Sequence, residues 1–201
     1  MSRKPVIGLV GGIGSGKSRV AAALAAHGGR LIAADPLGHE ALRQPAIRAR
    51  VAERWPTVID PDGEVSRRRL GRIVFADAAQ LRALEALVFP WIEGRVREEM
   101  VKADADPAAA FVVLDAAVML EAGWNNICDR IVYVHTPRPL RLARLREQRG
   151  WTADEVAARE RAQLSLSEKA TRADAAIDNA GPPEDLARQV DALLRRWRLV
   201  E

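Results

Sequence analysis

The chain has 201 residues, of which 48% are hydrophobic and 29% charged, and its formal net charge is +4 at pH 7. This length suits one compact domain with small insertions, and these fractions are near globular averages, which excludes wholesale disorder. No apolar run approaches the roughly 20 residues that span a bilayer, and the N-terminal segment reaches glycines too early for a signal peptide. A single cysteine, Cys128, excludes an internal disulfide framework and a cysteine-built zinc site. We therefore expect a soluble, cytoplasmic protein.

The positive charge is spread along the chain. Basic residues number 31 and acidic residues 27, and most of them are interleaved, which favours a solvated mixed-charge surface over a nucleic-acid-binding face. Local arginine clusters lie within residues 67–69, 138–149 and 195–198. Because the planar guanidinium group suits phosphate oxygens, small polyanions such as nucleotides are as reasonable a partner as a nucleic acid.

Short apolar runs alternate with helical patterns along the chain. The runs predict strands over residues 6–10, 31–33, 111–115, 131–135 and 175–178. The helical patterns cover residues 17–27, 36–54, 138–149, 153–173 and 183–198, and residues 66–103 form a helical block that we expect to kink or break at Pro90. Alternation of this kind favours a parallel sheet covered on both faces. The predicted fold class is α/β, a three-layer parallel sheet with an inserted helical subdomain.

A glycine-rich segment joins the first predicted strand to the first predicted helix. Residues 11–18 read GGIGSGKS and match the pattern G-x-x-x-x-G-K-[ST]. Glycines let successive N–H groups point at phosphate oxygens, and the helix N-terminus adds its positive end. Lys17 can reach the β and γ phosphates, and the Ser18 hydroxyl can coordinate Mg²⁺. The strand before and the helix after disfavour the alternative of a flexible glycine turn, so the segment predicts a nucleoside triphosphate site.

The phosphate loop alone does not identify the reaction. The N-K-x-D string by which GTPases identify guanine is absent from the sequence, and motor and helicase ATPases are generally larger. The size of the chain favours a small-molecule phosphotransferase. Two alternatives remain open at this point: another P-loop small-molecule or nucleoside (monophosphate) kinase, and a nucleotide-switch or nucleic-acid-binding P-loop protein.

Further segments follow the phosphate loop in a fixed order. They read LIAADPLGHE at 31–40, RRLGRIVF at 68–75, LEALV at 84–88, DAAVMLEAG at 115–123 and ADAAIDNAG at 173–181. Together with GLVGGIGSGKS at 8–18, this set resembles the dephospho-coenzyme A kinase family over nearly the whole chain. The resemblance implies a P-loop kinase core, a helical CoA-binding insertion at about residues 60–105 and a helical lid at about residues 138–172.

The resemblance also implies a reaction and its partners. The reaction is transfer of the γ-phosphoryl group of ATP to the ribose 3′-hydroxyl of dephospho-CoA, the last step of coenzyme A biosynthesis. The expected cofactors are ATP and Mg²⁺, and the expected partner is the small molecule dephospho-CoA. We expect neither a nucleic acid nor a membrane as a partner, and we expect a monomer or a weak homo-oligomer.

Residue roles follow partly from the pattern and partly from the resemblance. Asp35 follows the second predicted strand at the sheet edge of the phosphate loop, so it is the predicted base or orienting group, although it could simply cap the next helix. Asp115 ends the third predicted strand and could hold Mg²⁺ through water, contact the substrate or cap the strand end. Arg144 lies where the family places its catalytic arginine, whereas most other arginines of 138–149 are expected to be exposed.

The complete set of predicted site residues falls into four groups. The predicted catalytic residues are Asp35, Lys17 and Arg144. The predicted nucleotide-binding residues are Gly12, Ile13, Gly14, Ser15, Gly16, Lys17, Ser18, Arg19 and Asn179, the last with an adenine contact implied by the resemblance. The predicted substrate-binding residues are Asp35, Arg69, Phe89, Asp115 and Arg149, and the predicted metal ligand is Ser18.

The chain departs from the family pattern at three positions. Ala33 replaces the first aspartate of D-A-D, and Arg19 follows the loop serine where threonine is common. Phe89 stands where a histidine usually precedes the proline, and a phenyl ring cannot donate a hydrogen bond to phosphate or ribose as an imidazole can. His39 is one candidate substitute for that histidine. Our hypothesis is that Phe89 packs against the CoA moiety and that the three predicted catalytic residues suffice.

Overall fold

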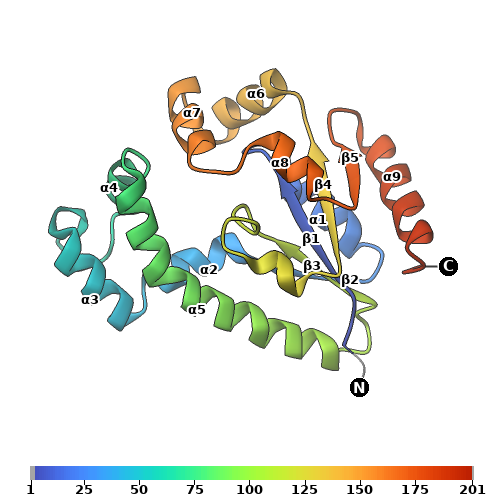
Figure 1. Ribbon diagram of the computed structural model, residues 1–201, viewed down its shortest axis with the longest axis horizontal. Coiled ribbons are helices and arrows are strands. Elements are labelled where there is room, and N and C mark those ends of the chain that lie inside the picture. The colour runs from blue at the N-terminus through green and yellow to red at the C-terminus, as the bar shows by residue number, and fades with distance from the viewer. Residues whose placement is uncertain (1–2, 201) are drawn as a thin grey trace. The chain divides into compact units, whose positions relative to one another are not determined.

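The computed structural model describes residues 3–200, and a parallel sheet of five strands forms its centre (Figure 1). The strands are β1 (Val6–Gly11), β2 (Gly29–Ala33), β3 (Phe111–Asp115), β4 (Arg130–His135) and β5 (Ala175–Asp178), in the order β2-β3-β1-β4-β5. All neighbouring strands pair in parallel, which confirms the predicted fold class. The order reverses direction at β1, so the end of this central strand is the switch point where open α/β sheets bind ligands.

Nine helices and two short 3-10 helices lie between and after the strands within the described residues. They are α1 (Lys17–Ala25), α2 (Ala34–Ala41), α3 (Pro45–Arg54), η1 (Pro56–Val58), α4 (Arg67–Val74), α5 (Ala78–Ala105), η2 (Trp124–Ile127), α6 (Arg138–Arg149), α7 (Ala153–Arg161), α8 (Leu166–Thr171) and α9 (Pro183–Arg196). No helix in residues 3–200 is long and apolar enough to cross a membrane.

Three predicted helices differ from the observed ones. The helix expected over 36–54 is two helices, because Gln44 adopts an extended conformation (ψ 127°) before Pro45, as residues before proline tend to do. The helix expected over 153–173 is also two, because Ser165 forms a capping box that starts α8. Of the kink or break expected at Pro90, the break is not observed, because α5 continues through Pro90 with Val88 and Ile92 buried on either side. The helical block expected over 66–103 divides instead at residues 75–77, between α4 and α5.

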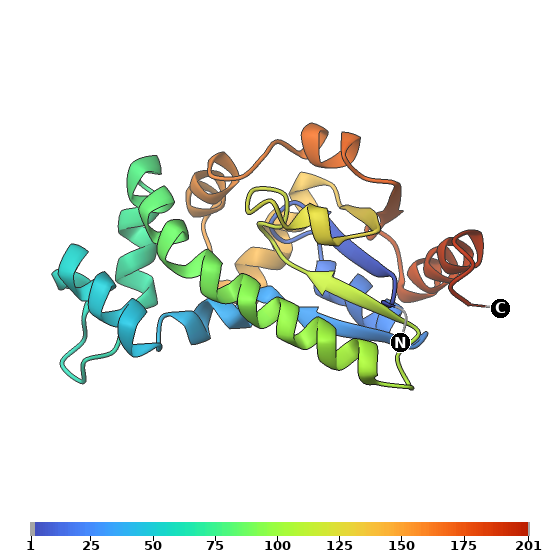
Figure 2. The same ribbon diagram turned by 60° about the horizontal axis from the view of Figure 1, so that its bottom comes forward.

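The sheet lies between two layers of covering elements. On one face, Ile7, Leu9 and Val113 join residues of α1 and α9 in the main hydrophobic core. On the other face, Gly8 has no side chain because a Cβ there would lie 2.5 Å from the sulfur of Met119. Figures 1 and 2 show α8 on the face opposite α1, which makes the three layers that the sequence predicts.

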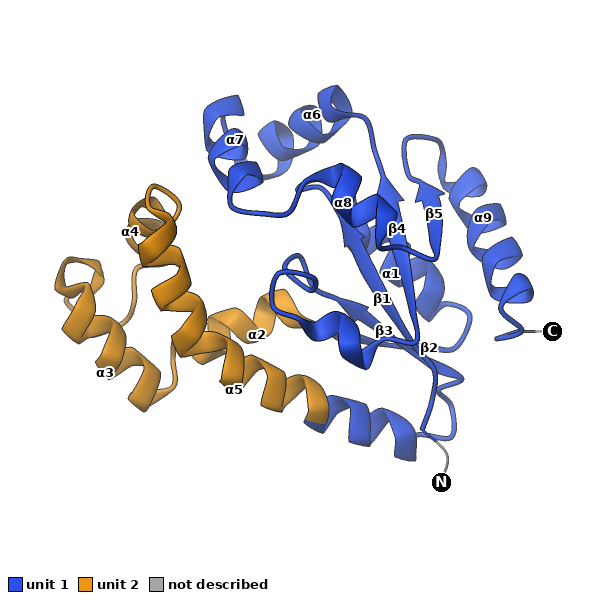
Figure 3. Ribbon diagram, viewed as in Figure 1, with its two compact units in different colours: residues 1–33, 98–201 blue, residues 34–97 orange. Residues whose placement is uncertain are grey.

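The chain forms two compact units, coloured separately in Figure 3. One comprises residues 1–33 and 98–201 and contains the sheet, and the other comprises residues 34–97. The second unit is built from α2, α3, α4 and most of α5 around a core of its own, which contains Val51, Trp55, Val58, Leu70 and Val74. This unit begins at Ala34, earlier than the helical insertion expected from about residue 60.

Candidate active site

The phosphate loop connects β1 to α1 and lies against α6. Gly14 (φ 76°) and Gly16 (φ 80°) have left-handed backbone conformations, which cost residues with a side chain about 1–2 kcal/mol. A Cβ on Gly14 would also lie 2.9 Å from Cδ1 of Leu145 and 3.0 Å from the carbonyl oxygen of Arg141. The glycines are therefore required both by the curvature of the loop and by the closeness of α6.

Carbonyl oxygens of the loop accept hydrogen bonds from side chains elsewhere in the chain. The carbonyl of Ile13 accepts a hydrogen bond from Nη1 of Arg141 at 3.0 Å. The carbonyl of Ser15 accepts from Oγ1 of Thr136 at 2.9 Å and from Nδ2 of Asn179 at 2.8 Å. These donors come from the β4–α6 junction, from α6 and from the end of β5, so three distant parts of the chain hold the loop.

Asn179 clamps the phosphate loop onto the end of β5. Its amide also lies 3.4 Å from the carbonyl of Gly16, and because both partners are acceptors, the NH₂ group must face them. Its Oδ1 is buried without a hydrogen-bond partner among the described residues. Sequence reasoning missed this clamp, since nothing local in the sequence links Asn179 to a loop 164 residues away. The adenine contact expected for this residue stays a prediction.

Arg144 brings an unsatisfied cationic group next to the loop. Its Nη2 donates to the carbonyl of Asn179 at 2.8 Å, while its Nη1 is buried and has no partner among residues 3–200. Nη1 lies 3.4 Å from the point where a Cβ on Gly16 would be. Burial lowers the pKa of Arg144, and repulsion from the nearby Arg19 lowers it further. Two cations that raise each other's energy favour an anion between them, so the arrangement suits a phosphate group.

Ser18 and Asp115 meet where α1 begins and β3 ends. The Ser18 hydroxyl donates to Oδ2 of Asp115 at 3.0 Å. The pairing of β1 with β3 sets this distance, because Asp115 lies opposite Leu9 in the register of the two strands. Both side chains offer the hard oxygen ligands that Mg²⁺ prefers. No cluster of three or more His, Cys, Asp or Glu that could hold a metal is found in residues 3–200, and Mg²⁺ in nucleotide sites typically takes few protein ligands beside phosphate and water.

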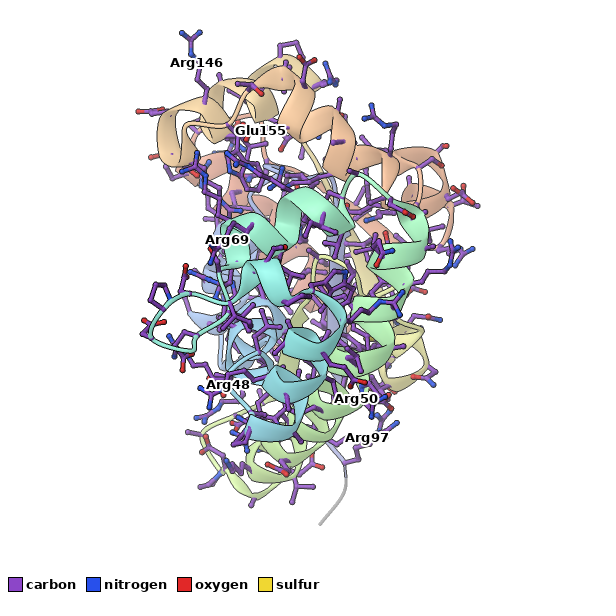
Figure 4. All side chains as sticks on the ribbon, turned by 90° about the vertical axis from the view of Figure 1, so that its left-hand side faces the viewer. Arg48, Arg50, Arg69, Arg97, Arg146 and Glu155 are labelled. Atoms are coloured by element: carbon purple, nitrogen blue, oxygen red, sulfur yellow. The ribbon has the colours of Figure 1, made fainter. Side chains whose placement is uncertain are left out.

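The other arginines of α6 have different environments. Arg146 is exposed and projects outward, as Figure 4 shows. Arg149 is also exposed, and its guanidinium lies 5.0 Å from the ring centroid of Trp151. Arg138 pairs with Glu160 of α7 at 3.3 Å and is half-exposed. Arg141 departs from the expectation of an exposed arginine, because it is only 2% exposed.

The remaining predicted site residues lie in the second unit. Asp35 is an exposed residue of α2, and because α2 starts at Ala34, Asp35 is inside the first turn and not the residue that caps it. Arg69, labelled in Figure 4, pairs with Asp60 at 2.5 Å. Phe89 lies within α5 and is half-buried. These three residues belong to a different compact unit from the phosphate loop, so their roles stay predictions.

Comparisons with known proteins agree on one family. The family model described as "Dephospho-CoA kinase" matches residues 5–185. A dephospho-CoA kinase of Geobacter metallireducens is 42% identical over 191 residues, which cover 94% of this chain and 94% of the relative. A dephospho-CoA kinase of Symbiobacterium thermophilum is 40% identical over 197 residues, which cover 96% of this chain and 80% of the relative.

Solved structures extend the comparison to the fold. The crystal structure of TT1252 from Thermus thermophilus has a TM-score of 0.82 at 34% identity and covers 97% of this chain and 98% of its own. A shikimate kinase from Acinetobacter baumannii, with a TM-score of 0.54 at 21% identity over 98% of this chain and 96% of its own, shares the fold alone. The phosphate loop, the family match over most of the chain and these relatives lead to one conclusion: the chain belongs to the dephospho-CoA kinase family, the phosphotransferases of the last step of coenzyme A biosynthesis.

Proposed function

We propose that the chain phosphorylates the ribose 3′-hydroxyl of dephospho-CoA with ATP and Mg²⁺, and that Ser18 and Asp115 hold the metal. The observation that carries the metal assignment is the 3.0 Å contact between the Ser18 hydroxyl and Oδ2 of Asp115 beside the phosphate loop. When bound, Mg²⁺ supplies positive charge to the β- and γ-phosphate oxygens. Asp115 orients the Ser18 hydroxyl so that its lone pairs are available to the ion.

The phosphate chain of ATP binds to the loop and to two cationic side chains. The N–H groups at the start of α1 face the β phosphate, together with the positive end of the helix. Lys17 neutralises charge between the β and γ phosphates. Arg144 uses its unsatisfied Nη1 on the oxygens of the transferring group, where negative charge develops in the transition state.

Asp35 acts on the acceptor hydroxyl. It follows β2 by two residues, and β2 and β1 are strands of the same parallel sheet whose carboxyl ends share one edge. The 3′-oxygen forms a bond to the γ phosphorus while the bond from that phosphorus to the β–γ bridging oxygen breaks and ADP leaves. The carboxylate of Asp35 orients the hydroxyl and accepts its proton.

The two helical segments take the remaining roles. Residues 60–105 bind the CoA moiety, with Arg69 on a phosphate and Phe89 on an apolar part of the ligand. Residues 138–172 form the lid, in which Arg149 contacts substrate phosphate. Asn179 adds an adenine contact to its clamp on the loop. We also propose a monomer or a weak homo-oligomer, and sedimentation velocity at micromolar concentrations tests this, because a stable dimer would contradict it.

The metal assignment is tested by the variants Ser18→Ala and Asp115→Asn. We expect each to raise the Mg²⁺ concentration for half-maximal activity about tenfold or more, and to weaken the Mg²⁺-dependent part of ADP binding in calorimetry. Thr57→Ala removes an exposed hydroxyl of η1, outside the segments assigned to binding, and serves as the control, with an unchanged Mg²⁺ requirement. An unchanged Mg²⁺ requirement in both site variants would refute the assignment.

A further inference from the structure

Arg141 is the arginine of α6 whose side chain is buried against the phosphate loop. Its Nη1 donates to the carbonyl of Ile13 at 3.0 Å and to Oε1 of Glu160 at 2.8 Å, and its Nε donates to the carbonyl of Thr136 at 3.2 Å. A Cβ on Gly12 would lie 2.8 Å from the same Nη1. The guanidinium thus contacts the backbone of the loop directly, and no side chain separates the two.

The hydrogen bond to Ile13 also fixes the direction of the next N–H group. A peptide unit is planar and trans, so the carbonyl of Ile13 and the N–H of Gly14 point in opposite directions. Because Arg141 holds the carbonyl on the α6 side, the N–H of Gly14 points away from α6. A carbonyl turned the other way would present its negative end to a phosphate and remove one of the donors.

The sequence around this peptide gives the loop little stiffness of its own. Gly12 and Gly14 flank Ile13, and glycine adopts positive and negative φ angles with nearly equal ease. Rotation of the Ile13–Gly14 peptide therefore meets little steric resistance within the loop itself. The N–H of Ser15 donates to the carbonyl of Gly12 at 3.0 Å and closes a turn around this peptide, but such a turn accommodates either orientation of its central peptide. The donor that binds the carbonyl of this peptide is Arg141.

The charge of Arg141 does not explain its place. Its guanidinium is paired with Glu160, a carboxylate that Arg138 shares, and its other hydrogen bonds go to backbone carbonyls. Arg144, by contrast, keeps a buried Nη1 without a partner among the described residues. We propose that Arg141 is a positioning residue, which holds the phosphate loop in its phosphate-binding conformation through the carbonyl of Ile13, whereas Arg144 acts on phosphate directly. This proposal rests on the proposed function, since it concerns how the loop binds ATP.

The test compares Arg141→Met with Arg138→Met, because both remove an arginine that binds Glu160 but only Arg141 contacts Ile13. We expect Arg141→Met to raise both the Kd for ADP in calorimetry and the KM for ATP about tenfold or more, the scale of one charge-assisted hydrogen bond. The KM for dephospho-CoA should change less than about threefold, since that substrate does not depend on the loop donors. Arg138→Met should raise the Kd for ADP and the KM for ATP much less than Arg141→Met does, because it removes only the shared ion pair with Glu160 and leaves the hydrogen bond to Ile13 in place.

A second variant keeps the proposal testable if Arg141→Met does not fold. Arg141→Lys retains a cationic donor, and we expect it to bind ADP more tightly than Arg141→Met and to restore part of the KM for ATP. An unchanged Kd for ADP in a folded Arg141 variant would overturn the proposal. Equal increases in the KM values of both substrates would also overturn it, because they would indicate a general loss of structure. If the wild type made no CoA, the proposed function would fail, while the Kd for ADP would still decide the role of Arg141.

Discussion

Replacing Gly16 by alanine tests how the phosphate loop is held, because the new methyl group would collide with Asn179. The Cβ would lie 2.3 Å from Nδ2 of Asn179, a distance that real Cβ atoms do not show, at a position whose φ is 80°. Asn179 cannot simply move aside, since it is 1% exposed and its amide is bound to the carbonyl of Ser15 at 2.8 Å.

The structure gives a magnitude for each part of this cost. The left-handed backbone costs alanine about 1–2 kcal/mol. Displacing Asn179 leaves a buried carbonyl and a buried amide unsatisfied, which costs about 1–3 kcal/mol more. We therefore expect Gly16→Ala to lower the free energy of unfolding by about 2–5 kcal/mol. Gly123 is the matched control, because its φ is 75° and nothing lies within 4 Å of its Cβ position, so Gly123→Ala should cost the backbone term alone.

A double-mutant cycle separates the two terms. In an Asn179→Ala background the space for the methyl group already exists, so adding Gly16→Ala should cost only about 1–2 kcal/mol. The assay is urea unfolding without nucleotide, followed by tryptophan fluorescence and circular dichroism. If Gly16→Ala cost the same in both backgrounds, the clash with Asn179 would play no part and the reasoning would be refuted.

Three further predictions concern single side chains. Lys169 is buried and pairs with Glu121 at 3.0 Å, so Lys169→Met should cost about 3–5 kcal/mol of stability, because the largely buried carboxylate of Glu121 keeps only the N–H of Leu164 as a partner among the described residues. The exposed Lys102→Met should cost less than about 1 kcal/mol in the same urea titration. Burial, followed by the charge of Asp129, raises the pKa of the Cys128 thiol from 9.0 to about 12, so alkylation of the folded protein should stay slow at pH 9 and become fast only in urea. Because the pKa is higher in the folded state, the protonated thiol stabilises the fold fully below pH 9, and this contribution is lost as the pH rises towards 12. An equal rate of alkylation in the folded and the urea-unfolded protein at pH 9 would contradict the raised pKa. Phe89→His should change kcat/KM for dephospho-CoA by less than about tenfold, because the three predicted catalytic residues suffice without a histidine at this position. A gain of a hundredfold or more would contradict that hypothesis.

The sheet and the phosphate loop could be predicted because their signals are local. The strands β3 and β5 begin and end where their apolar runs do, and the glycine pattern places the loop after β1 without knowledge of any distant residue. The same is true of α6, which lies between Pro137 and the left-handed Gly150. The positions of Ser18 at the end of the loop and of Asp115 at the end of a strand could each be predicted in this way, whereas the hydrogen bond between them, over 97 residues of chain, could not.

The supports of the loop could not be predicted, because they depend on contacts between distant residues. Arg141 is 128 residues from Ile13, and nothing in its own segment distinguishes it from Arg138 or Arg146. The helical spacing places it on a face, but only the docking of α6 on the loop decides that this face is buried. Lys169 is likewise an ordinary helical lysine in sequence and becomes a buried ion-pair partner through Glu121, which follows β3.

The central claim is tested most directly by phosphate transfer from ATP in the presence of Mg²⁺, with dephospho-CoA, AMP, adenosine and buffer as parallel acceptors. The product is identified by mass, and the position of the new phosphate is determined by NMR. We expect CoA, phosphorylated at the 3′ position, from dephospho-CoA alone, with formation abolished in Lys17→Ala and strongly reduced in Asp35→Asn. Binding of ATP without formation of CoA, or faster phosphorylation of AMP than of dephospho-CoA, would contradict the account.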